Sequence, residues 1–315
     1  MPAPTLSIVI PAYNEAENLP ALYDKFASQY RGRDDIEFLF VDDASTDTTI
    51  TVLHDLVQKD DRVRAWNIRQ NSAKGGALAV GFSNARGKYI VTMDADLQDD
   101  PSEIPRLLSV LENGADAVIG WKKERKDSLQ RRMTSRFFNG ICNMCFGHSF
   151  RDMNSGLKAF RNIAVHDLPL YGGLFRFIPH VLRFRGYTVV EIPVLHHTRH
   201  AGKSKFGLKS RCTGLLDLLT ITFLLKYQKR PFHLFGTVGI LLFLGGLLCG
   251  LYLSGIWIQG TAIGGRPLLL LSVLLMVLGG QFISLGWLGE LIVLHKNGGN
   301  LPLYEEITHD TETAG

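Results

Sequence analysis

The chain has 315 residues, 46% of them hydrophobic and 20% charged, and its 34 Lys and Arg against 30 Asp and Glu give a formal net charge of +4. This composition excludes disordered, collagen-like and disulfide-stapled proteins, and the net charge is too small to indicate nucleic-acid binding. The four cysteines are too sparse for a disulfide framework, and Cys142-x-x-Cys145 lacks the second pair that a zinc site needs. We therefore expect a reducing compartment.

The N-terminal part of the chain alternates short apolar runs with helical patterns. The runs predict strands at Leu6 to Ile10, Glu37 to Val41, Tyr89 to Met93 and Ala115 to Ile119. The patterns between and after them predict helices at Ala16 to Tyr30, Thr48 to Lys59, Gly75 to Ala85 and Ser102 to Asn113. Short apolar runs without alternation are typical of strands buried on both faces. The sequence predicts an α/β domain with a mostly parallel sheet, in which ligands bind at the carboxyl ends of the strands.

Acidic residues follow three of the predicted strands, in the segments PAYNE, DDASTD and DADLQDDP. We interpret Asp47 and Asp100 as N-caps of the next helices. Asp94 and Asp96 differ, because alternate strand-like positions would place both carboxylates on one side, where they repel unless a cation lies between them. Mg²⁺ or Mn²⁺ would accept these oxygens together with the Gln98 amide. The sequence therefore predicts a metal site formed by Asp94, Asp96 and Gln98.

A metal held by few carboxylates normally completes its shell with phosphate oxygens. Neither GxxxxGK[ST] nor GxGxxG occurs, but Lys74-Gly75-Gly76 opens a predicted helix. It could present amides to an anion, and an ordinary glycine-containing helix start explains it equally well. Seven Lys or Arg fall within Lys122 to Arg136, and five within Arg199 to Arg211. The glycine and serine spacing of Arg199 to Lys205 favours phosphate binding, whereas the lysines of the first cluster favour a solvated basic face.

Two long apolar runs follow. Leu234 to Ile258 carries no charge, and Pro267 to Gly289 continues as Leu291 to Leu294 after Glu290. A bilayer core of about 30 Å needs roughly 20 apolar helical residues, so these runs predict a transmembrane hairpin rather than two helices of a soluble core. The shorter stretch Gly214 to Tyr227 predicts an interfacial helix. We expect Glu290 to reach the membrane interface, and the glycines of the second run could allow close helix packing within an oligomer.

Flanking charge predicts the orientation of the hairpin. Lys226, Lys229 and Arg230 precede the first run, His295 and Lys296 follow the second, and the connecting loop carries only Arg266. Both ends should therefore face the cytoplasm. The opening MPAPTLSIVIPAYNE lacks the features of a signal peptide. We expect a cytoplasmic globular domain over residues 1–211, a juxtamembrane helix over 212–232, two transmembrane helices over 233–296 (about 234–258 and 267–294) and a cytoplasmic acidic tail over 297–315, in a multi-pass inner (plasma) membrane protein.

The segments SIVIPAYNE, VDDASTD, MDADLQDDP and HTRHAGKSKFG together carry a resemblance. They resemble the family 2 glycosyltransferases with a GT-A-type nucleotide-sugar-binding fold. More narrowly, they resemble polyprenyl-phosphate glycosyltransferases: dolichol-phosphate mannosyltransferases, bactoprenyl-phosphate glucosyltransferases and aminoarabinose transferase relatives. The resemblance covers almost the whole chain, including both apolar runs.

The resemblance implies roles for particular residues. Those that would bind the nucleotide sugar are Pro11, Tyr13, Glu15, Asp42 or Asp43, Lys74, Asp94 and Asp96. Asp94, Asp96 and Gln98 match the metal-binding triplet of the family. Those that would handle phosphate or lie near the reaction centre are Arg125, Arg131, Ser135, Asp152, Arg199, Lys203, Ser204 and Lys205. Lys158 stands where some relatives have arginine, which leaves its contacts open.

The resemblance implies transfer of a single hexose from a nucleotide diphosphate sugar to a membrane polyprenyl phosphate, with metal dependence and inversion. UDP-glucose is the favoured donor, followed by GDP-mannose and a UDP-linked aminoarabinose. A polysaccharide or glycan acceptor and a non-enzymatic membrane scaffold are the alternatives. We expect no nucleic-acid partner, and since relatives form tetramers, a homo-oligomer is favoured.

Overall fold

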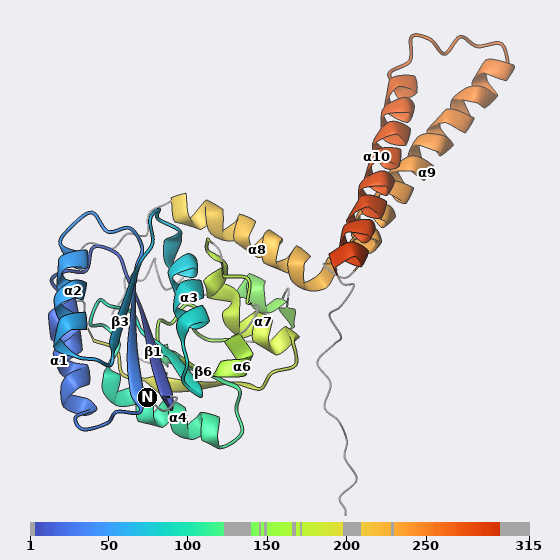
Figure 1. Ribbon diagram of the computed structural model, residues 1–315. Helices are drawn as coiled ribbons and strands as arrows, with labels where there is room; N and C mark the ends of the chain where they lie inside the picture. The colour runs from blue at the N-terminus through green and yellow to red at the C-terminus, as the bar shows by residue number, and fades with distance from the viewer. Residues whose placement is uncertain are drawn as a thin grey trace, which may run out of the picture. The chain divides into compact units, whose positions relative to one another are not determined.

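The computed structural model describes residues 4–122, 140–144, 146–147, 150–165, 168–170, 172–197, 209–227 and 230–296, and the structural statements below concern these residues. The chain divides into two compact units, Met1–Thr222 and Phe223–Gly315. The first unit is an α/β structure, and the second contains a hairpin of two long helices (Figure 1).

The first unit is built on a seven-stranded sheet in the order β3-β2-β1-β4-β6-β5-β7. Its strands are β1 Leu6–Ala12, β2 Ile36–Asp42, β3 Val63–Asn67, β4 Tyr89–Thr92, β5 Ala117–Lys122, β6 Lys158–Arg161 and β7 Val189–Val194. Only β6 runs antiparallel to its neighbours, β4 and β5. The other pairs are parallel. The predicted mostly parallel sheet is confirmed, and β3, β6 and β7 were not predicted.

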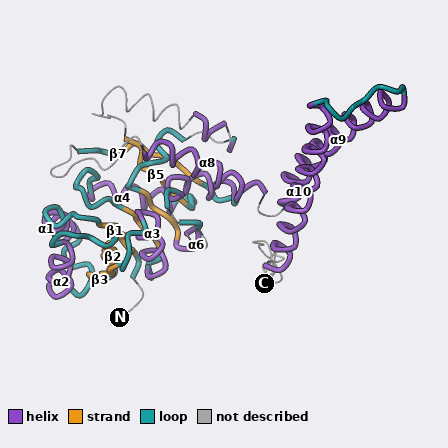
Figure 2. Tube along the Cα trace, turned by 90° about the horizontal axis from the view of Figure 1, so that it is seen from above, coloured by secondary structure: helices purple, strands orange, loops and turns teal. Residues whose placement is uncertain are grey.

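Helices cover both faces of the sheet. One face carries α1 Leu19–Gln29, α2 Thr49–Lys59 and α4 Ile104–Glu112, which follows a short 3₁₀ turn, η1 Pro101–Glu103. The other face carries α3 Ala73–Asn84, α6 Asn162–Val165, η2 Leu174–Phe177 and α7 Ile178–Phe184. Figure 2 shows the sheet strands between these helices. The predicted helices are present, although α1 begins at Leu19 rather than Ala16, because Glu15 to Asn18 form a turn.

The central strands are buried on both faces, as their unbroken apolar runs indicated. In β1, Ile8 and Ile10 belong to the core cluster that contains Phe26 of α1. Val9, between them, belongs to the opposite cluster with Phe82 of α3. Side chains alternate across a strand, so a run that is apolar at every position suits a sheet with helices on both sides.

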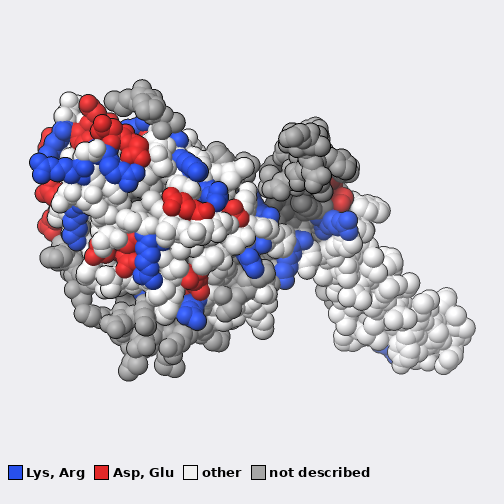
Figure 3. Space-filling model, turned by 90° about the horizontal axis from the view of Figure 1, so that it is seen from below, with Lys and Arg blue, Asp and Glu red and all other residues white. Residues whose placement is uncertain are grey.

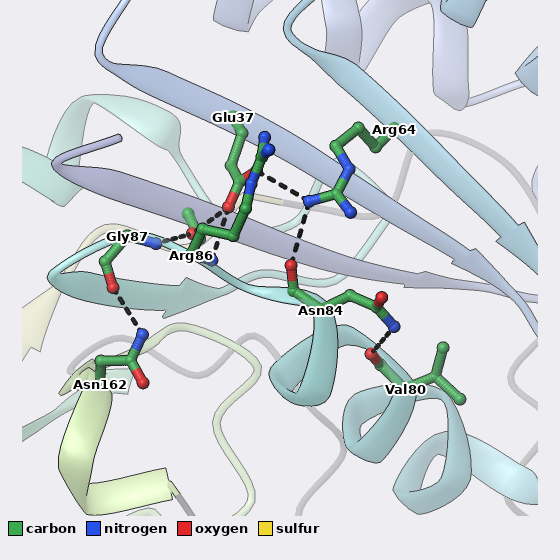
Figure 4. A network of polar contacts seen from close by, with 8 residues as sticks. Glu37, Arg64, Val80, Asn84, Arg86, Gly87 and Asn162 are labelled. Atoms are coloured by element: carbon green, nitrogen blue, oxygen red, sulfur yellow. Dashed lines mark hydrogen bonds and ion pairs between the residues drawn. The ribbon is translucent and has the colours of Figure 1, made fainter. Parts of the chain in front are cut away.

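A polar network fastens the amino end of the sheet (Figure 4). Glu37 of β2, only 3% exposed, accepts hydrogen bonds from Ser7 Oγ at 2.7 Å and from the Arg86 amide at 2.8 Å. The guanidinium groups of Arg64 and Arg86 donate to its other oxygen at 3.0 and 2.8 Å. Ser7 Oγ also accepts from the Gly87 amide at 2.8 Å. The buried carboxylate therefore joins β1, β2, β3 and the segment before β4.

Helix α8 Lys209–Tyr227 begins before the predicted Gly214. Within the first unit, Arg176 of η2 pairs with Asp217 of α8, with Nη1 and Oδ2 3.5 Å apart. Figure 1 shows α8 (yellow) at the end of the sheet opposite to the chain's N-terminus. The pair thus attaches α8 to the end of the unit at which the strands have their carboxyl termini.

The second unit contains α9 Pro231–Ile258 and α10 Pro267–Lys296. By length and composition, Pro231–Ile258 and Pro267–Val293 are able to cross a membrane. Figure 3 shows their visible surface almost without charged side chains. Glycines let the two backbones meet: a Cβ on Gly279 would lie 2.6 Å from the Phe243 amide nitrogen, and one on Gly246 would lie 2.7 Å from the Ser272 carbonyl oxygen. Gly279 therefore serves packing within the hairpin.

Glu290 also has a role inside the hairpin. Its Oε2 accepts a hydrogen bond from the Phe232 amide at 3.3 Å, in the first turn of α9. A carboxylate at a helix N-terminus satisfies an otherwise unpaired amide and complements the helix dipole.

Candidate active site

The candidate site lies where the order of the strands reverses. From β1 the chain builds outward through β2 to β3, then returns through α3 to place β4 on the other side of β1. In such sheets a ligand binds at the carboxyl ends beside this switch point. Four non-glycine residues with positive φ, Asn14, Ala44, Ala73 and Leu97, follow β1, β2, β3 and β4 at this end. Such strained backbone clusters at functional sites.

The loops after β1 and β2 are joined by hydrogen bonds. The Asn14 amide donates to Ser45 Oγ at 2.8 Å, and the Thr46 amide donates to Asn14 Oδ1 at 2.8 Å. The Glu15 amide donates to the buried Thr49 hydroxyl at 3.0 Å. These contacts fix the segment that contains the predicted nucleoside-pocket residues. Those residues are Pro11, Tyr13, Glu15, Asp42 and Asp43.

Asp42 and Asp43 face different partners. Asp42, fully buried, accepts from the Ser45 amide at 3.0 Å and from the Ser45 hydroxyl. Asp43 Oδ1 accepts from the Ser72 amide at 2.7 Å and from Ser72 Oγ at 2.9 Å. Asp43 therefore connects the end of β2 to the start of α3, which brings Lys74 to the site.

Lys74 and Asp94 form an ion pair between Nζ and Oδ1. The side chains are 27% and 32% exposed, so the pair is open to solvent. Burial disfavours the ionised Asp94 carboxylate, but the positive charges of Lys74, Lys122 and Lys158 together outweigh it and hold the pKa of Asp94 below its usual value. Lys74 Nζ also lies 5.4 Å from the centre of the Phe175 ring. Gly75 packs so tightly that a Cβ would lie 2.7 Å from the carbonyl oxygens of Leu170 and Gly172.

Asp94 and Asp96 lie beyond the end of β4, not at alternate positions of a strand as the prediction assumed. β4 ends at Thr92, and the residues that follow form a turn in which Leu97 has a φ of 59°. Asp96 Oδ1 accepts from the Gln98 amide at 3.3 Å within this turn. The Gln98 side chain reaches the His197 carbonyl at 3.5 Å. The three predicted metal ligands therefore lie on the loop that follows β4.

Of the two predicted N-caps, Asp100 is confirmed: it is the N-cap of η1, and its Oδ1 accepts from the Ser102 amide at 2.9 Å. The prediction for Asp47 was wrong, because Thr48 is the N-cap of α2; Asp47 lies one position earlier, and its Oδ1 accepts from the Thr49 amide at 3.0 Å. Asp100 Oδ2 also lies 2.8 Å from His197 Nε2. Burial opposes ionisation of Asp100, but the hydrogen bonds from His197 and Ser102 together outweigh it and lower the pKa of that carboxyl.

Asp99 is a site residue that sequence reasoning missed. It is 2% exposed, and its Oδ1 lies 3.6 Å from His196 Nδ1 and 3.9 Å from Lys122 Nζ. His196 and Asp99 also form an isolated antiparallel β-bridge through their backbones. The run DLQDDP contained Asp99, but nothing in its local pattern separated it from Asp100.

Lys158 is a buried lysine in the same region. It is the first residue of β6, is 4% exposed, and donates to the Ser155 carbonyl. Burial and the nearby Lys74 ammonium together lower the pKa of Lys158 to about 7, although the carboxylates of Asp94, Asp152 and Asp99 oppose the shift. These influences place Lys158 among the acidic residues of the site.

Asp152 is buried in a loop that Glu191 of β7 holds in place. The amides of Arg151 and Asp152 donate to Glu191 Oε1 at 2.9 and 3.2 Å. Burial raises the pKa of Glu191, although these two amides oppose the shift.

The remaining predicted phosphate-handling residues lie outside the described ranges. They are Arg125, Arg131, Ser135, Arg199, Lys203, Ser204 and Lys205. The described chain leads directly to both basic segments, through Lys122 at the end of β5 and through His196 and His197 after β7.

A hard divalent cation fits the donor chemistry of the described residues. The only side chain that contacts Asp94 Oδ1 in the described part of the chain is itself a cation, the Lys74 ammonium. No group of three or more His, Cys, Asp or Glu within the described ranges is arranged to hold a metal ion. A cation bound here would therefore use carboxylate and amide oxygens together with oxygens from a ligand.

The fold is shared with a solved glycosyltransferase. Glucosyl-3-phosphoglycerate synthase of Mycobacterium tuberculosis, in complex with Mn²⁺, UDP-glucose and phosphoglyceric acid, aligns with a TM-score of 0.54 and 18% identity, over 70% of this chain and 80% of that chain. The first unit thus has a GT-A-type fold.

Residues 7–180 match the family described as glycosyl transferase family 2. A dodecaprenyl-phosphate galacturonate synthase of Rhizobium johnstonii is 35% identical over 296 residues, which are 91% of this chain and 87% of that protein. An undecaprenyl-phosphate 4-deoxy-4-formamido-L-arabinose transferase of Edwardsiella ictaluri is 33% identical, over 91% of this chain and 88% of that protein. The chain belongs to glycosyl transferase family 2 and is a glycosyltransferase, and its resemblance to polyprenyl-phosphate glycosyltransferases is confirmed.

Proposed function

We propose that this protein transfers one sugar from a nucleotide diphosphate sugar to the phosphate of a polyprenyl phosphate in the membrane. The observation that carries the proposal is the partly exposed Asp94 carboxylate, with its Lys74 partner, at the switch point of a GT-A-type sheet. Two relatives named for polyprenyl-phosphate acceptors match nearly the whole chain, including the two apolar helices. A lipid acceptor also explains those helices, because about 0.8 kcal/mol per buried CH₂ retains such a lipid in the bilayer.

In the proposed reaction, an oxygen of the acceptor phosphate attacks the anomeric carbon of the donor. The bond from that carbon to the diphosphate breaks, and the nucleoside diphosphate leaves with the electron pair. Direct displacement would invert the anomeric centre. Negative charge grows on the leaving diphosphate, so catalysis requires positive groups placed in advance. Lys74 and the predicted phosphate residues Arg199, Lys203 and Lys205 would supply them.

A divalent cation, Mg²⁺ or Mn²⁺, would stabilise the leaving diphosphate when bound. The residues proposed to hold it are Asp94, Asp96 and Gln98. The Mn²⁺ and UDP-glucose in the structure of the mycobacterial enzyme support this assignment by analogy of fold.

Asp152 would act on the acceptor side. A phosphate monoester is largely ionised near pH 7, its second pKa being about 6, so a strong general base is not required. The buried Asp152, held by the contacts of its loop with Glu191, would orient the acceptor phosphate or accept its residual proton.

The test is product analysis with the purified full chain and a short polyprenyl phosphate. UDP-glucose is the first donor to try, and GDP-mannose, UDP-galacturonate and a UDP-linked formamidoarabinose complete the panel. We expect one donor to yield an organic-extractable lipid whose mass has increased by one sugar. Sugar in a water-soluble polymer instead would indicate a polysaccharide or glycan acceptor.

A pair of aspartate variants tests whether the site is active. Asp96→Asn should abolish transfer, whereas Asp61→Asn, on an exposed turn before β3, should retain it. Full turnover by Asp96→Asn would instead support a scaffold whose site has lost its function.

We further propose an inner-membrane location with the first unit and both termini in the cytoplasm. A membrane-impermeant maleimide should label Gly264→Cys, in the loop between α9 and α10, in intact cells. It should label Lys59→Cys, exposed on α2, only after lysis. The reverse pattern would contradict the orientation. Assembly into a homo-oligomer stays a prediction.

A further inference from the structure

The Lys74–Asp94 pair joins the start of α3 to the loop after β4. Lys74 is the second residue of α3, and Asp94 follows the last residue of β4 by two positions. The ammonium contacts Asp94 Oδ1, and roughly a quarter to a third of each side chain is exposed. A ligand that enters from solvent can therefore reach this ion pair.

The other two described lysines of the site, Lys158 and Lys122, are more buried than Lys74. Lys158 is 4% exposed and donates to the Ser155 carbonyl. Lys122 is 17% exposed and lies 3.9 Å from the buried Asp99. Lys74 is more exposed than either, and its ammonium lies 5.4 Å from the centre of the Phe175 ring. Of these three lysines, Lys74 is the most accessible to a ligand that enters from solvent.

The position of the Lys74 ammonium conflicts with a metal on Asp94. A dication bound to the same carboxylate would meet an ammonium at close range, and the repulsion between them would be twice that between two single charges. Lysine has a compact charge on a flexible stem with four carbons, so it can change partners without a backbone shift. A cation that coordinates Asp94 should therefore displace Lys74.

We infer that Lys74 is an exchangeable internal cation: it neutralises Asp94 before the substrate binds, gives way to the divalent cation, and then pairs with the diphosphate oxygens of the donor. The inference rests on the proposed function, because it requires both a divalent cation and a diphosphate. It makes Lys74 a residue through which metal and nucleotide strengthen each other's binding.

A lysine with a fixed position would behave differently. It would weaken metal binding by one amount and strengthen nucleotide binding by another, each independent of the other ligand. The factor by which one ligand changes the affinity of the other would then not depend on Lys74. An exchanging lysine adds to that coupling, because bound metal releases it for the nucleotide. Coupling is reciprocal and can be measured from either ligand.

The experiment measures Mn²⁺ binding by electron paramagnetic resonance on the full chain in detergent. Each variant is titrated alone and with saturating UDP or GDP, whichever the wild type binds with Mn²⁺. The variants are Lys74→Gln and the charge-retaining Lys74→Arg. The matched control is Lys122→Gln, which removes one lysine charge next to Asp99 instead of Asp94. Thermal unfolding confirms that each variant is folded.

Without nucleotide, Lys74→Gln should bind Mn²⁺ about fivefold more tightly than the wild type, as expected for loss of a partly exposed competitor. The factor by which nucleotide improves Mn²⁺ affinity should fall about tenfold in Lys74→Gln. Lys122→Gln should keep the wild-type factor, and Lys74→Arg should stay close to it.

Equal coupling factors in the wild type and Lys74→Gln would overturn the exchange and leave the proposed function intact. A wild-type chain that makes the lipid product but binds no Mn²⁺, even with nucleotide, would also overturn the exchange. It would refute the metal-assisted mechanism as well, but not the transfer itself. Absence of any lipid product with the donor panel would remove the proposed function.

Discussion

Asp94 and Asp99 direct their carboxylates at the same backbone position, Gly156. A Cβ on Gly156 would lie 2.6 Å from Asp94 Oδ2 and 2.7 Å from Asp99 Oδ2. The Gly156 carbonyl accepts a hydrogen bond from Thr92 Oγ1 of β4 at 2.8 Å, which fixes the backbone beneath both carboxylates. The missing side chain therefore allows two acidic residues of one loop to approach the segment before β6.

Gly156→Ala should displace both carboxylates, because its methyl group cannot share their space. A misplacement of about 1 Å at a reacting centre can cost roughly 100-fold in rate, and we expect a loss of at least this order in kcat/KM. The measurement is the initial rate of lipid-product formation with the purified chain. Mn²⁺ affinity should fall in parallel if Asp94 holds the metal.

Gly140→Ala is the matched control for this variant. A Cβ on Gly140 would meet nothing within 4 Å, and the residue lies in a helix. Its activity and thermal stability should match those of the wild type. Wild-type activity in Gly156→Ala would show that the two carboxylates tolerate displacement, and would remove their approach to Gly156 from the account of the site.

The core of the fold followed from the sequence because its strands are buried on both faces and read as unbroken apolar runs. β3 and β7 are the edges of the sheet and only partly buried, so their sequences, VRAWN and VVEIPV, mix polar and apolar residues. β6 begins with a buried lysine, Lys158, which an apolar pattern cannot reveal. Its antiparallel place between β4 and β5 is a tertiary property.

Several residues of the candidate site could be predicted from the sequence, but the contacts between them could not. The motif DADLQ placed Asp94 and Asp96 correctly at the end of β4. Lys74, the partner of Asp94, is 20 residues away from it in the sequence, and His196, the partner of Asp99, is 97 residues away. Those contacts depend on the order of strands, which brings distant loops together at one edge. The turn at Leu97, with positive φ, also had no local signal such as glycine or asparagine.

Lys158 predicts a pH dependence of stability. Burial and the nearby Lys74 ammonium together lower its pKa from 10.5 to about 7. Between these two values the unfolded chain holds a proton that the folded chain has released, so stability should rise with pH, by about 1 kcal/mol per pH unit at most. Thermal unfolding of the metal-free chain between pH 7 and 9 measures this slope. Lys158→Met should reduce it, and an unchanged slope in that variant would show that Lys158 keeps its proton.

Glu37 predicts a second pH dependence of stability. Here hydrogen bonds to the carboxylate, not burial, set the direction of the pKa shift. Burial would raise its pKa, but the hydrogen bonds from Ser7, Arg86 and Arg64 outweigh burial and lower the pKa below 4.5. The stabilisation is therefore complete above about pH 4.5 and is lost as the pH falls through the lower, folded-state value. Glu37→Gln leaves two guanidinium groups without their carboxylate and should cost about 3 kcal/mol at pH 7. Differential scanning of wild type and variant at several pH values should show the difference shrinking below pH 4.5.

The exposed pair Arg33–Asp35 provides the control for Glu37. Its side chains are 49% and 41% exposed, so Asp35→Asn should change stability by less than about 1 kcal/mol. Both variants should retain activity at temperatures well below unfolding, because Glu37 lies at the amino end of the sheet, away from the site. A smaller effect from Glu37→Gln than from Asp35→Asn would contradict the role of the network.

Two adjacent glycines of α10, Gly279 and Gly280, have different surroundings, and substituting each one tests the packing of the hairpin. A Cβ on Gly279 would lie 2.6 Å from the Phe243 amide nitrogen and 2.7 Å from the Gly239 carbonyl oxygen, whereas one on Gly280 would meet nothing within 4 Å. Gly279→Val should force α9 and α10 apart and lower the unfolding temperature in detergent by several degrees, since overpacking typically costs about 1–3 kcal/mol. Gly280→Val should unfold like the wild type if that face contacts lipid. A Gly280→Val chain that unfolds normally but elutes at a smaller size in gel filtration would place Gly280 in a contact between copies of the chain. Equal effects of the two substitutions on the unfolding temperature would contradict the packing of the hairpin.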